Sequence, residues 1–287
     1  MAIHQLNLRK MDTFKDEVVR YELQTHEGRI TLNDYIGTEI SIVFDGTILC
    51  LECQKRITKT YAGGFCFQCM QTLPQADMCM VKPELCHFDR GTCRDSKWGK
   101  SHCFTPHIVY LAKSSAIKVG ITRENPPERR WMDQGAIEAM AIAEVPDRKT
   151  SGLIEIALAK HIDDKTDFRK MLRGETVKDS LDDMYQTIIK HVPDNLTQHL
   201  IQDRKLVSIN YPLNDHPDKI KTQNLDKQNR IQGKLLGIKG QYLIFEDFVF
   251  NVRAHSGYEV SFEGSPNPNP QSFEPKEEEP SSLFDFF

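Results

Sequence analysis

Eight cysteines are the residues of this sequence whose type and spacing point most directly to chemistry. The first four form two Cys-x2-Cys pairs, Cys50 with Cys53 and Cys66 with Cys69, and twelve residues separate the pairs. Each pair lets a short turn direct two thiolates at one point, and two such pairs complete the tetrahedral sulfur shell that suits Zn2+. We therefore expect a structural zinc site of four thiolates. Redox-active pairs and buried free thiols are the alternatives.

The other four cysteines are more widely spaced, with six, six and nine residues between them, and match no common zinc finger. Two of them stand next to a histidine, at His87 and His102. We expect these thiols to bind a second Zn2+, with a mixture of core cysteines and one His/Cys site as the alternative. The four residues are Cys79, Cys86, Cys93 and Cys103.

A second set of chemically capable residues lies between residues 107 and 175. Four short motifs follow one another there: His107-Ile108-Val109-Tyr110-Leu111, Lys118-Val119-Gly120-Ile121-Thr122, Arg130-Trp131 and Glu155. In this order they resemble the GIY-YIG nuclease superfamily, above all the branch whose second motif reads Lys-[Val/Ile]-Gly-Ile-Thr. With a cysteine-rich segment before them and a β segment after them, the whole arrangement resembles a bacterial family of unknown function placed near those nucleases.

The resemblance implies a role for each matching residue. Tyr110 stands where a tyrosine acts as base or orients water, Arg130 where an arginine contacts the scissile phosphate, and Glu155 where a glutamate binds one divalent metal, Mg2+ or Mn2+. Phosphodiester hydrolysis needs such a set, because a water must be activated and the developing charge neutralised. Two departures, Ile108 for the first glycine and Lys118 for the second-motif tyrosine, leave open whether the chain is an endonuclease or a non-catalytic DNA- or RNA-binding module.

The same residues also allow purely structural interpretations. Tyr110 can be a half-buried strand aromatic, Arg130 a solvated helix residue, and Glu155 a residue that favours a helix N-terminus. Lys118 lowers the pKa of Tyr110 only if the strand register places both on one face of the sheet, since a slip of one residue separates them.

Basic residues are concentrated around the metal and motif region. From Cys79 to Trp131 there are ten basic and five acidic residues, with aromatic side chains interleaved, and this pattern favours contact with phosphates and bases. An ordinary solvated surface is the alternative. The candidate nucleic-acid-binding residues are Arg94, Lys97, Lys100, Arg123 and Arg129.

The last 24 residues carry the whole net charge of −4, because residues 1–263 hold equal numbers of acidic and basic side chains. Their proline-rich, acidic composition is typical of a linker. The terminal residues Leu283, Phe284, Phe286 and Phe287 resemble the core of sliding-clamp-binding peptides and the docking tail of single-stranded-DNA-binding proteins. We expect this tail to bind a sliding clamp or another replication or repair protein; packing on its own body is the alternative. A scaffold that is recruited to its partner through this tail is a further alternative for the function of the whole chain.

The elements that must position these residues give an α+β fold class. It comprises a zinc-ribbon-like module, a GIY-YIG-like three-stranded sheet with helices, and flanking β segments that form one barrel or sheet; Asp45-Gly46 reads as a turn within the first segment. By composition the chain divides into an N-terminal β segment (1–49), a cysteine-rich zinc-binding module (50–106), the α/β unit (107–175), a helical connector (176–205), a C-terminal β segment (206–263) and the acidic tail (264–287).

Composition also excludes some classes of protein. No apolar run approaches the ~18–20 residues that a membrane helix needs, and the first residues contain no continuous apolar stretch of a signal peptide. We therefore expect a cytoplasmic protein without membrane contact, where thiols stay reduced and available to metal.

Overall fold

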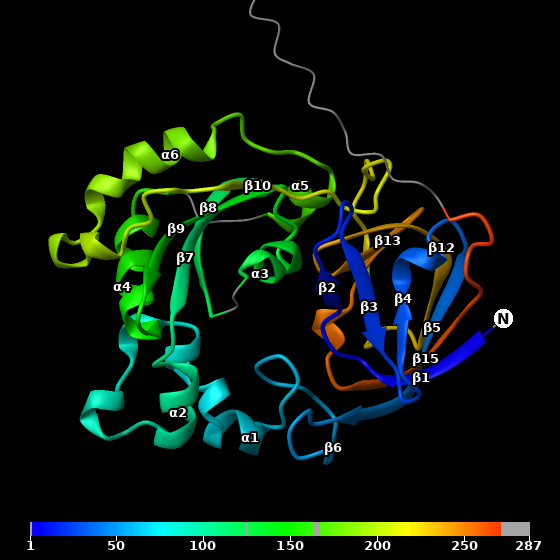
Figure 1. Cartoon of the computed structure of the whole chain (residues 1–287). Coiled ribbons are helices and arrows are strands. Elements are labelled where there is room, and N and C mark those ends of the chain that lie inside the picture. Colours follow the sequence, from blue (N-terminus) through cyan, green and yellow to red (C-terminus); the bar gives the residue numbers. More distant parts are fainter. Residues whose placement is uncertain (1, 124–125, 163–166, 271–287) are drawn as a thin grey trace, which may run out of the picture.

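The computed structural model describes residues 2–123, 126–162 and 167–270, and Figure 1 shows their arrangement. Three sheets and several short helices make up the mixed α+β fold. The large sheet contains, in spatial order, β1 (Ala2–Asn7), β15 (Tyr258–Gly264), β5 (Glu39–Leu49), β12 (Arg230–Lys239), β13 (Tyr242–Phe245), β14 (Val249–Asn251) and β11 (Thr222–Gln223), with β6 (Arg56–Ile57) beside β5.

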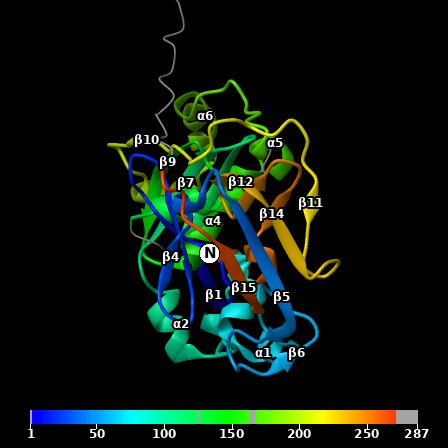
Figure 2. The ribbon, with the colours of Figure 1, turned by 90° about the vertical axis from the view of Figure 1, so that its right-hand side faces the viewer.

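The large sheet joins the two ends of the described chain. β15 lies between β1 and β5 and pairs with both in antiparallel register, as the side view in Figure 2 shows. The N-terminal and C-terminal β segments therefore form one sheet, with the rest of the chain inserted between them. The expectation of a barrel is wrong, because β1 and the two-residue strand β11 stay at opposite edges and no sheet of the described residues closes on itself.

A β-bulge, and not a turn, occupies Asp45-Gly46. β5 runs without interruption through this dipeptide, and its register against β15 shifts between the Phe44–Val260 and Ile48–Tyr258 pairs. Gly46 has a φ of +88°, and the Asp45 carboxylate accepts the Thr47 N–H at 2.7 Å. The glycine thus supplies the positive φ that a bulge needs, and the strand continues directly to Cys50.

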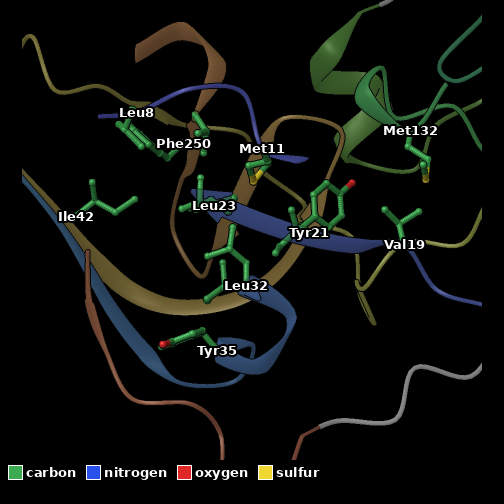
Figure 3. Close-up of a cluster of buried hydrophobic side chains, with 14 of the residues drawn as sticks. Leu8, Met11, Val19, Tyr21, Leu23, Leu32, Tyr35, Ile42, Met132 and Phe250 are labelled. Atoms are coloured by element: carbon green, nitrogen blue, oxygen red, sulfur yellow. The ribbon is translucent and has the colours of Figure 1, made fainter. Parts of the chain in front are cut away.

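A small sheet packs inside the curve of the large one. It consists of β2 (Asp12–Phe14), β3 (Arg20–Gln24) and β4 (Arg29–Thr31), followed by the turn η1 (Leu32–Tyr35). Figure 3 shows buried side chains of this region, among them Leu8, Met11, Tyr21, Leu23 and Phe250. The same core includes Met132 and Tyr110, so one apolar core unites the β segments with one face of the 107–175 unit.

The 107–175 unit has the expected order of strand, strand, helix, strand, helix. Its elements are β7 (His107–Lys113), β8 (Ile117–Thr122), α3 (Glu128–Asp133), β9 (Glu138–Val145), α4 (Arg148–Ala159) and α5 (Phe168–Leu172). β7 is the central strand between β8 and β9, and β10 (Leu206–Ser208) from the following segment adds a fourth strand. α4 and α6 (Leu181–Ile188) cover one face of the sheet in a second core, and α3 covers the other.

The cysteine-rich segment connects the two halves of the molecule through short elements, in cyan in Figure 1. They are α1 (Phe67–Thr72), η2 (Pro74–Ala76), η3 (Met78–Met80), η4 (Pro83–Leu85), η5 (Phe88–Arg90) and α2 (Ser96–His102). Three further 3-10 helices are η6 (Ile189–His191), η7 (Asp194–His199) and η8 (Arg253–His255). Within the described residues, every helix is too short or too polar to cross a bilayer.

Candidate metal centres and active site

The first four cysteines lie together at the junction of β5, β6 and α1. One sulfur from each of Cys50, Cys53, Cys66 and Cys69 lies within 4.8 Å of the others, and the Cys53 and Cys66 sulfurs are 3.9 Å apart. A tetrahedron with zinc–sulfur bonds of about 2.3 Å has edges of about 3.8 Å. The donor set therefore fits Zn2+, and the cluster is consistent with one structural zinc site.

Local backbone structure explains why these thiols converge. Gln54 adopts a left-handed conformation (φ 57°) and its N–H bonds the Cys50 carbonyl at 3.0 Å, which closes the first turn. Cys66 is the N-cap of α1, and its sulfur accepts the Cys69 N–H at 3.3 Å. The Cys66 N–H in turn points at the Cys50 sulfur at 3.2 Å. Such N–H···S contacts stabilise thiolates and hold metal ligands in orientation.

The environment of the cluster affects its thiols unequally. Burial raises the pKa of Cys50, but backbone N–H groups of Cys53, Cys66 and Glu52 outweigh it and bring the pKa to about 6. Burial and the neighbouring thiols raise the pKa of Cys69 to about 12. A bound cation displaces such protons, so metal binding at this cluster depends on pH.

The second four cysteines also meet, around a small cavity of about 20 Å³. Cys79, Cys86, Cys93 and Cys103 all line it. Burial is the largest cause that raises the pKa of Cys79 and of Cys103; Asp77 adds to the rise at Cys79, and negative charge on Cys86 adds a smaller contribution at both thiols.

Asp77 and His87, which also carry metal-binding side chains, are among the other residues that line this cavity. The ligand atoms of Asp77, Cys79 and His87 lie within 4.8 Å of one another. The Asp77 carboxylate also bonds the Arg94 guanidinium at 2.8 Å. Spacing alone did not reveal the place of Asp77 beside these thiols.

This second cluster is fixed against the start of α4. A Cβ on Gly152 would lie 2.6 Å from the Pro83 Cβ, so η4 rests directly on the helix. Arg148 donates through its backbone N–H to the Cys103 carbonyl at 2.8 Å and through its guanidinium to the Met80 carbonyl at 2.7 Å. The position of α4, and of Glu155 on it, therefore depends on the cysteine-rich segment.

Tyr110 lies at the centre of the 107–175 unit, with 1% of its surface exposed. It pairs with Gly120 on β8, where a Cβ would lie 2.6 Å from the tyrosine hydroxyl oxygen. The hydroxyl accepts a hydrogen bond from the Gln134 side chain at 2.6 Å. Burial raises the pKa of Tyr110, a positive charge on Arg130 opposes that rise, and a negative charge on Glu155 adds to it. Three of the four motif residues thus interact electrostatically.

The fourth motif residue, Lys118, lies on the same face of the sheet as Tyr110. Tyr110 pairs with Gly120 and Ala112 pairs with Lys118, and directly opposite residues of antiparallel strands share a face. The register condition for an influence of Lys118 on Tyr110 is therefore met. Among the described residues, Glu155 belongs to neither group of three or more clustered metal-binding side chains.

Sequence reasoning missed two residues near this centre. Arg148 is half-buried, and burial lowers its pKa while the Cys103 and Glu155 charges oppose that shift. His107 is fully buried; burial lowers its pKa, with Arg148 and Arg123 as further causes. Its Nδ1–H donates to the Thr105 carbonyl at 2.7 Å, and its Nε2 has no partner in the described structure. The position of His107 as the first residue of the first motif was the available signal.

The residues expected to bind nucleic acid have different environments. Lys97 and Lys100 are exposed on α2, and Arg123 is exposed just after β8. Arg129 forms an ion pair with Asp12 on β2. The Arg94 guanidinium donates to the Met70 and Leu73 carbonyls, both at 2.9 Å, and pairs with Asp77. All these contacts lie within the cysteine-rich segment, which they stabilise. The tail residues Leu283, Phe284, Phe286 and Phe287 lie outside the described residues.

The fold and the first cluster define a mixed α+β protein with a candidate structural zinc site. The chain belongs to the family described as "Protein of unknown function (DUF2797)", whose model matches residues 37–260. No curated protein and no solved structure matches the chain. The family match does not link the chain to the GIY-YIG nucleases, so that likeness rests on the motifs of the sequence.

Proposed function

We propose that this chain is a zinc-stabilised nucleic-acid-binding protein whose 107–175 unit is a Mg2+-dependent, GIY-YIG-like endonuclease. The observation that carries the proposal is the electrostatic interaction of Arg130 and Glu155 with the buried hydroxyl of Tyr110. These residues come from a strand and two helices, and the same three match the motif roles. A buried tyrosine whose pKa is raised, under the influence of both a cation and a carboxylate, favours a functional site.

Each side chain has a definite task in this proposal. Tyr110, held by Gln134 at 2.6 Å, orients the attacking water, whose oxygen bonds to phosphorus as the bond to the leaving oxygen breaks. Arg130 offers a planar fork to the phosphate oxygens as negative charge grows on them. Glu155 would hold a divalent ion together with substrate oxygens and waters, as Mg2+ prefers, and the ion would supply charge at the leaving oxygen.

The presence of Lys118 in place of the second-motif tyrosine favours a second candidate function, which is nucleic-acid binding without cleavage. A lysine on the face of Tyr110 contributes a point charge for phosphate but lacks the hydroxyl of the second-motif tyrosine. In this case the unit is a platform for DNA or RNA, and its affinity falls steeply with salt.

One experiment separates the two candidates. Purified protein is incubated with Mg2+ and labelled single-stranded, duplex and branched DNA and RNA, next to Glu155→Gln and the control Glu27→Gln, which changes an exposed glutamate of the small-sheet hairpin. The endonuclease proposal expects cleavage by wild type and Glu27→Gln, and at least a 100-fold loss in Glu155→Gln with binding retained. Equal cleavage by Glu155→Gln contradicts it, and salt-dependent binding without cleavage supports the platform.

We also propose that Cys79, Cys86, Cys93 and Cys103 bind a second zinc ion. Support comes from the shared cavity of about 20 Å³ and from the mutual charge effects of these thiols. Metal analysis should give two zinc ions per chain and one in a Cys93→Ser variant. One ion in the wild type, unchanged in that variant, would remove the second site.

The partner of the tail is likewise a proposal. Leu283, Phe284, Phe286 and Phe287 are proposed to dock on a sliding clamp or another replication or repair protein, because a short tethered apolar peptide gains affinity from its anchoring. Removing residues 280–287 should abolish co-purification of that partner, and an unchanged pull-down contradicts the proposal.

A further inference from the structure

A basic cavity of about 430 Å³ opens between the small sheet, the first cysteine cluster and η8. Its walls come from three distant parts of the chain and include Arg9, Lys10, Asp12, Gly63 and Arg253. Pockets for small ligands or for parts of larger ones begin at about 300 Å³, so this cavity is large enough for a phosphate group and its neighbouring atoms.

Two of its cations lack a counter-charge. The Lys10 ammonium bonds the Asp133 carboxylate at 2.8 Å, and the Asp12 carboxylate is engaged by Arg129 and Arg29. Arg9 and Arg253 are exposed, and neither guanidinium has a hydrogen bond or ion pair within the described part of the chain. The cavity therefore presents two free guanidinium forks, the groups best suited to bidentate binding of phosphate oxygens.

The loops that carry the first cysteine cluster form one wall of this basic cavity, through Leu51 and Gly63. In the loop before Cys66, a Cβ on Gly64 would lie 2.5 Å from Leu51 and 3.3 Å from Ser256, so the loop packs closely against the segment after η8. The neighbouring Gly63 has a φ of +81° and open space where a Cβ would be. The loop thus approaches the Arg253 region closely and leaves room at Gly63 for a ligand.

The basic cavity is also connected to the proposed active site. Asp12, in its wall, is paired with Arg129, and Arg129 precedes Arg130 on α3. Figure 1 shows β2 and α3 facing each other across the middle of the molecule. A strand that placed one phosphate at Arg130 would extend along this side of the protein.

We propose that the basic cavity binds a phosphate of the nucleic-acid backbone, away from the scissile phosphate, through Arg9 and Arg253. The identity of the ligand as nucleic acid rests on the proposed function, whereas the affinity for phosphate rests on the cavity alone. Backbone contacts of this kind fix position without reading sequence. Because the zinc-site loop forms a wall, removing zinc from the first cluster should weaken phosphate binding here.

The test measures binding of a fluorescein-labelled 20-nucleotide single strand by anisotropy across a salt series. We expect the double variant Arg9→Gln/Arg253→Gln to bind at least tenfold more weakly at 50 mM salt, with a salt slope about 0.7 smaller, since each phosphate contact of a single strand contributes about 0.7. Lys205→Gln, which removes one exposed charge on the connector, should bind like the wild type. Both substituted arginines are exposed, so an unchanged melting temperature verifies the fold.

A second arm uses inorganic pyrophosphate in calorimetry to separate the two proposals. If wild type and the double variant bind the oligonucleotide equally, the basic cavity is not a phosphate site, and the proposed function is unaffected. If wild type ignores the oligonucleotide but binds pyrophosphate only with Arg9 and Arg253 intact, the cavity is a site for a free phosphate compound and the proposed function fails. Absence of both binding events overturns both.

Discussion

The two groups of four cysteines come together by opposite routes. In the first, two close pairs at Cys-x2-Cys spacing bring four thiols within 4.8 Å, and three of the four residues are buried. In the second, widely spaced thiols line a cavity shared with Asp77 and His87, and all four are partly exposed. Short spacing lets local turns build a metal site, whereas long spacing leaves the task to the surrounding fold.

The clusters also differ in what they hold together. The first lies at the end of β5, next to the large sheet, and its loop packs on the segment after η8. The second contributes nothing to the two large apolar cores, since none of the described residues between 74 and 106 belongs to them, but it supports the start of α4. The first is therefore expected to govern stability, and the second to govern the position of Glu155.

The largest effect is expected from Cys66→Ser, which removes one thiol of the first cluster, while serine can still cap the N-terminus of α1. Structural zinc is worth about 10–16 kcal/mol in small zinc-binding peptides, so we expect the free energy of unfolding to fall by at least about 5 kcal/mol. Chemical denaturation together with zinc analysis measures the effect. A loss below about 1 kcal/mol would show that this cluster is not a structural metal site.

Cys86→Ser should have a smaller effect on stability and a larger one on function. The melting temperature should fall by less than half of the Cys66→Ser change, because the surrounding segment lies outside the large cores. Amide hydrogen exchange should accelerate in residues 77–103, and nucleic-acid cleavage or binding should weaken. Equal thermal losses in the two variants would contradict the division of roles.

Gly152→Ala tests the contact between the second cluster and α4 without touching a thiol. The new Cβ would lie 2.6 Å from the Pro83 Cβ and 2.8 Å from the Glu84 backbone nitrogen, so the helix must move. Overpacking of this kind costs about 1–3 kcal/mol, measured by denaturation. The control Lys160→Ala, at the exposed C-cap of the same helix, should leave stability and activity unchanged.

The smallest expected effect is a pH dependence of stability, which arises in η8, the element next to the loop of the first cluster. Buried His255 donates through Nδ1 to the Asn251 carbonyl at 2.8 Å and accepts the Leu225 N–H at Nε2, 3.1 Å away, so the fold needs the neutral ring. Burial lowers its pKa below the ordinary 6.5. This stabilisation is complete above about pH 6.5 and is lost as the pH falls through the lowered pKa.

Denaturation of His255→Gln between pH 7.5 and 5 checks this contribution. The variant should be less stable than the wild type at pH 7.5, and the difference should shrink toward pH 5, because burial lowers the pKa of His255 and protonation then opposes folding. A difference independent of pH would show that the histidine does not titrate with folding.

Sequence patterns were most informative where the determining contacts are local. The Cys-x2-Cys pairs and the strand–strand–helix–strand–helix order follow from short spacing and periodicity, and the structure has both. Gly120 illustrates the limit of such patterns. The motif that contains it is visible in the sequence, but the reason for a glycine there is the Tyr110 ring on the facing strand, and this contact is known only once the strand register is known.

Features that depend on distant contacts were not predictable. Asp45-Gly46 has the composition of a turn, yet pairing of β5 with β15 converts it into a bulge. Asp77 lies in the second cluster, and Arg148 lies near the centre of the α/β unit. Both positions depend on the packing of η4 on α4, which the sequence does not reveal. The prediction of a barrel was wrong for a similar reason, because the sequence pattern of a strand does not indicate which edge of the sheet stays unpaired.

The pairing of β1 with β15 also has a consequence for synthesis of the protein. Ala2 pairs with Gly264, so the large sheet cannot be completed until almost the whole described chain has left the ribosome. The first cysteine cluster emerges much earlier, and its thiols are available to metal before the sheet exists. Such a long separation between partners slows folding, and an early metal-bound nucleus would shorten the search that remains.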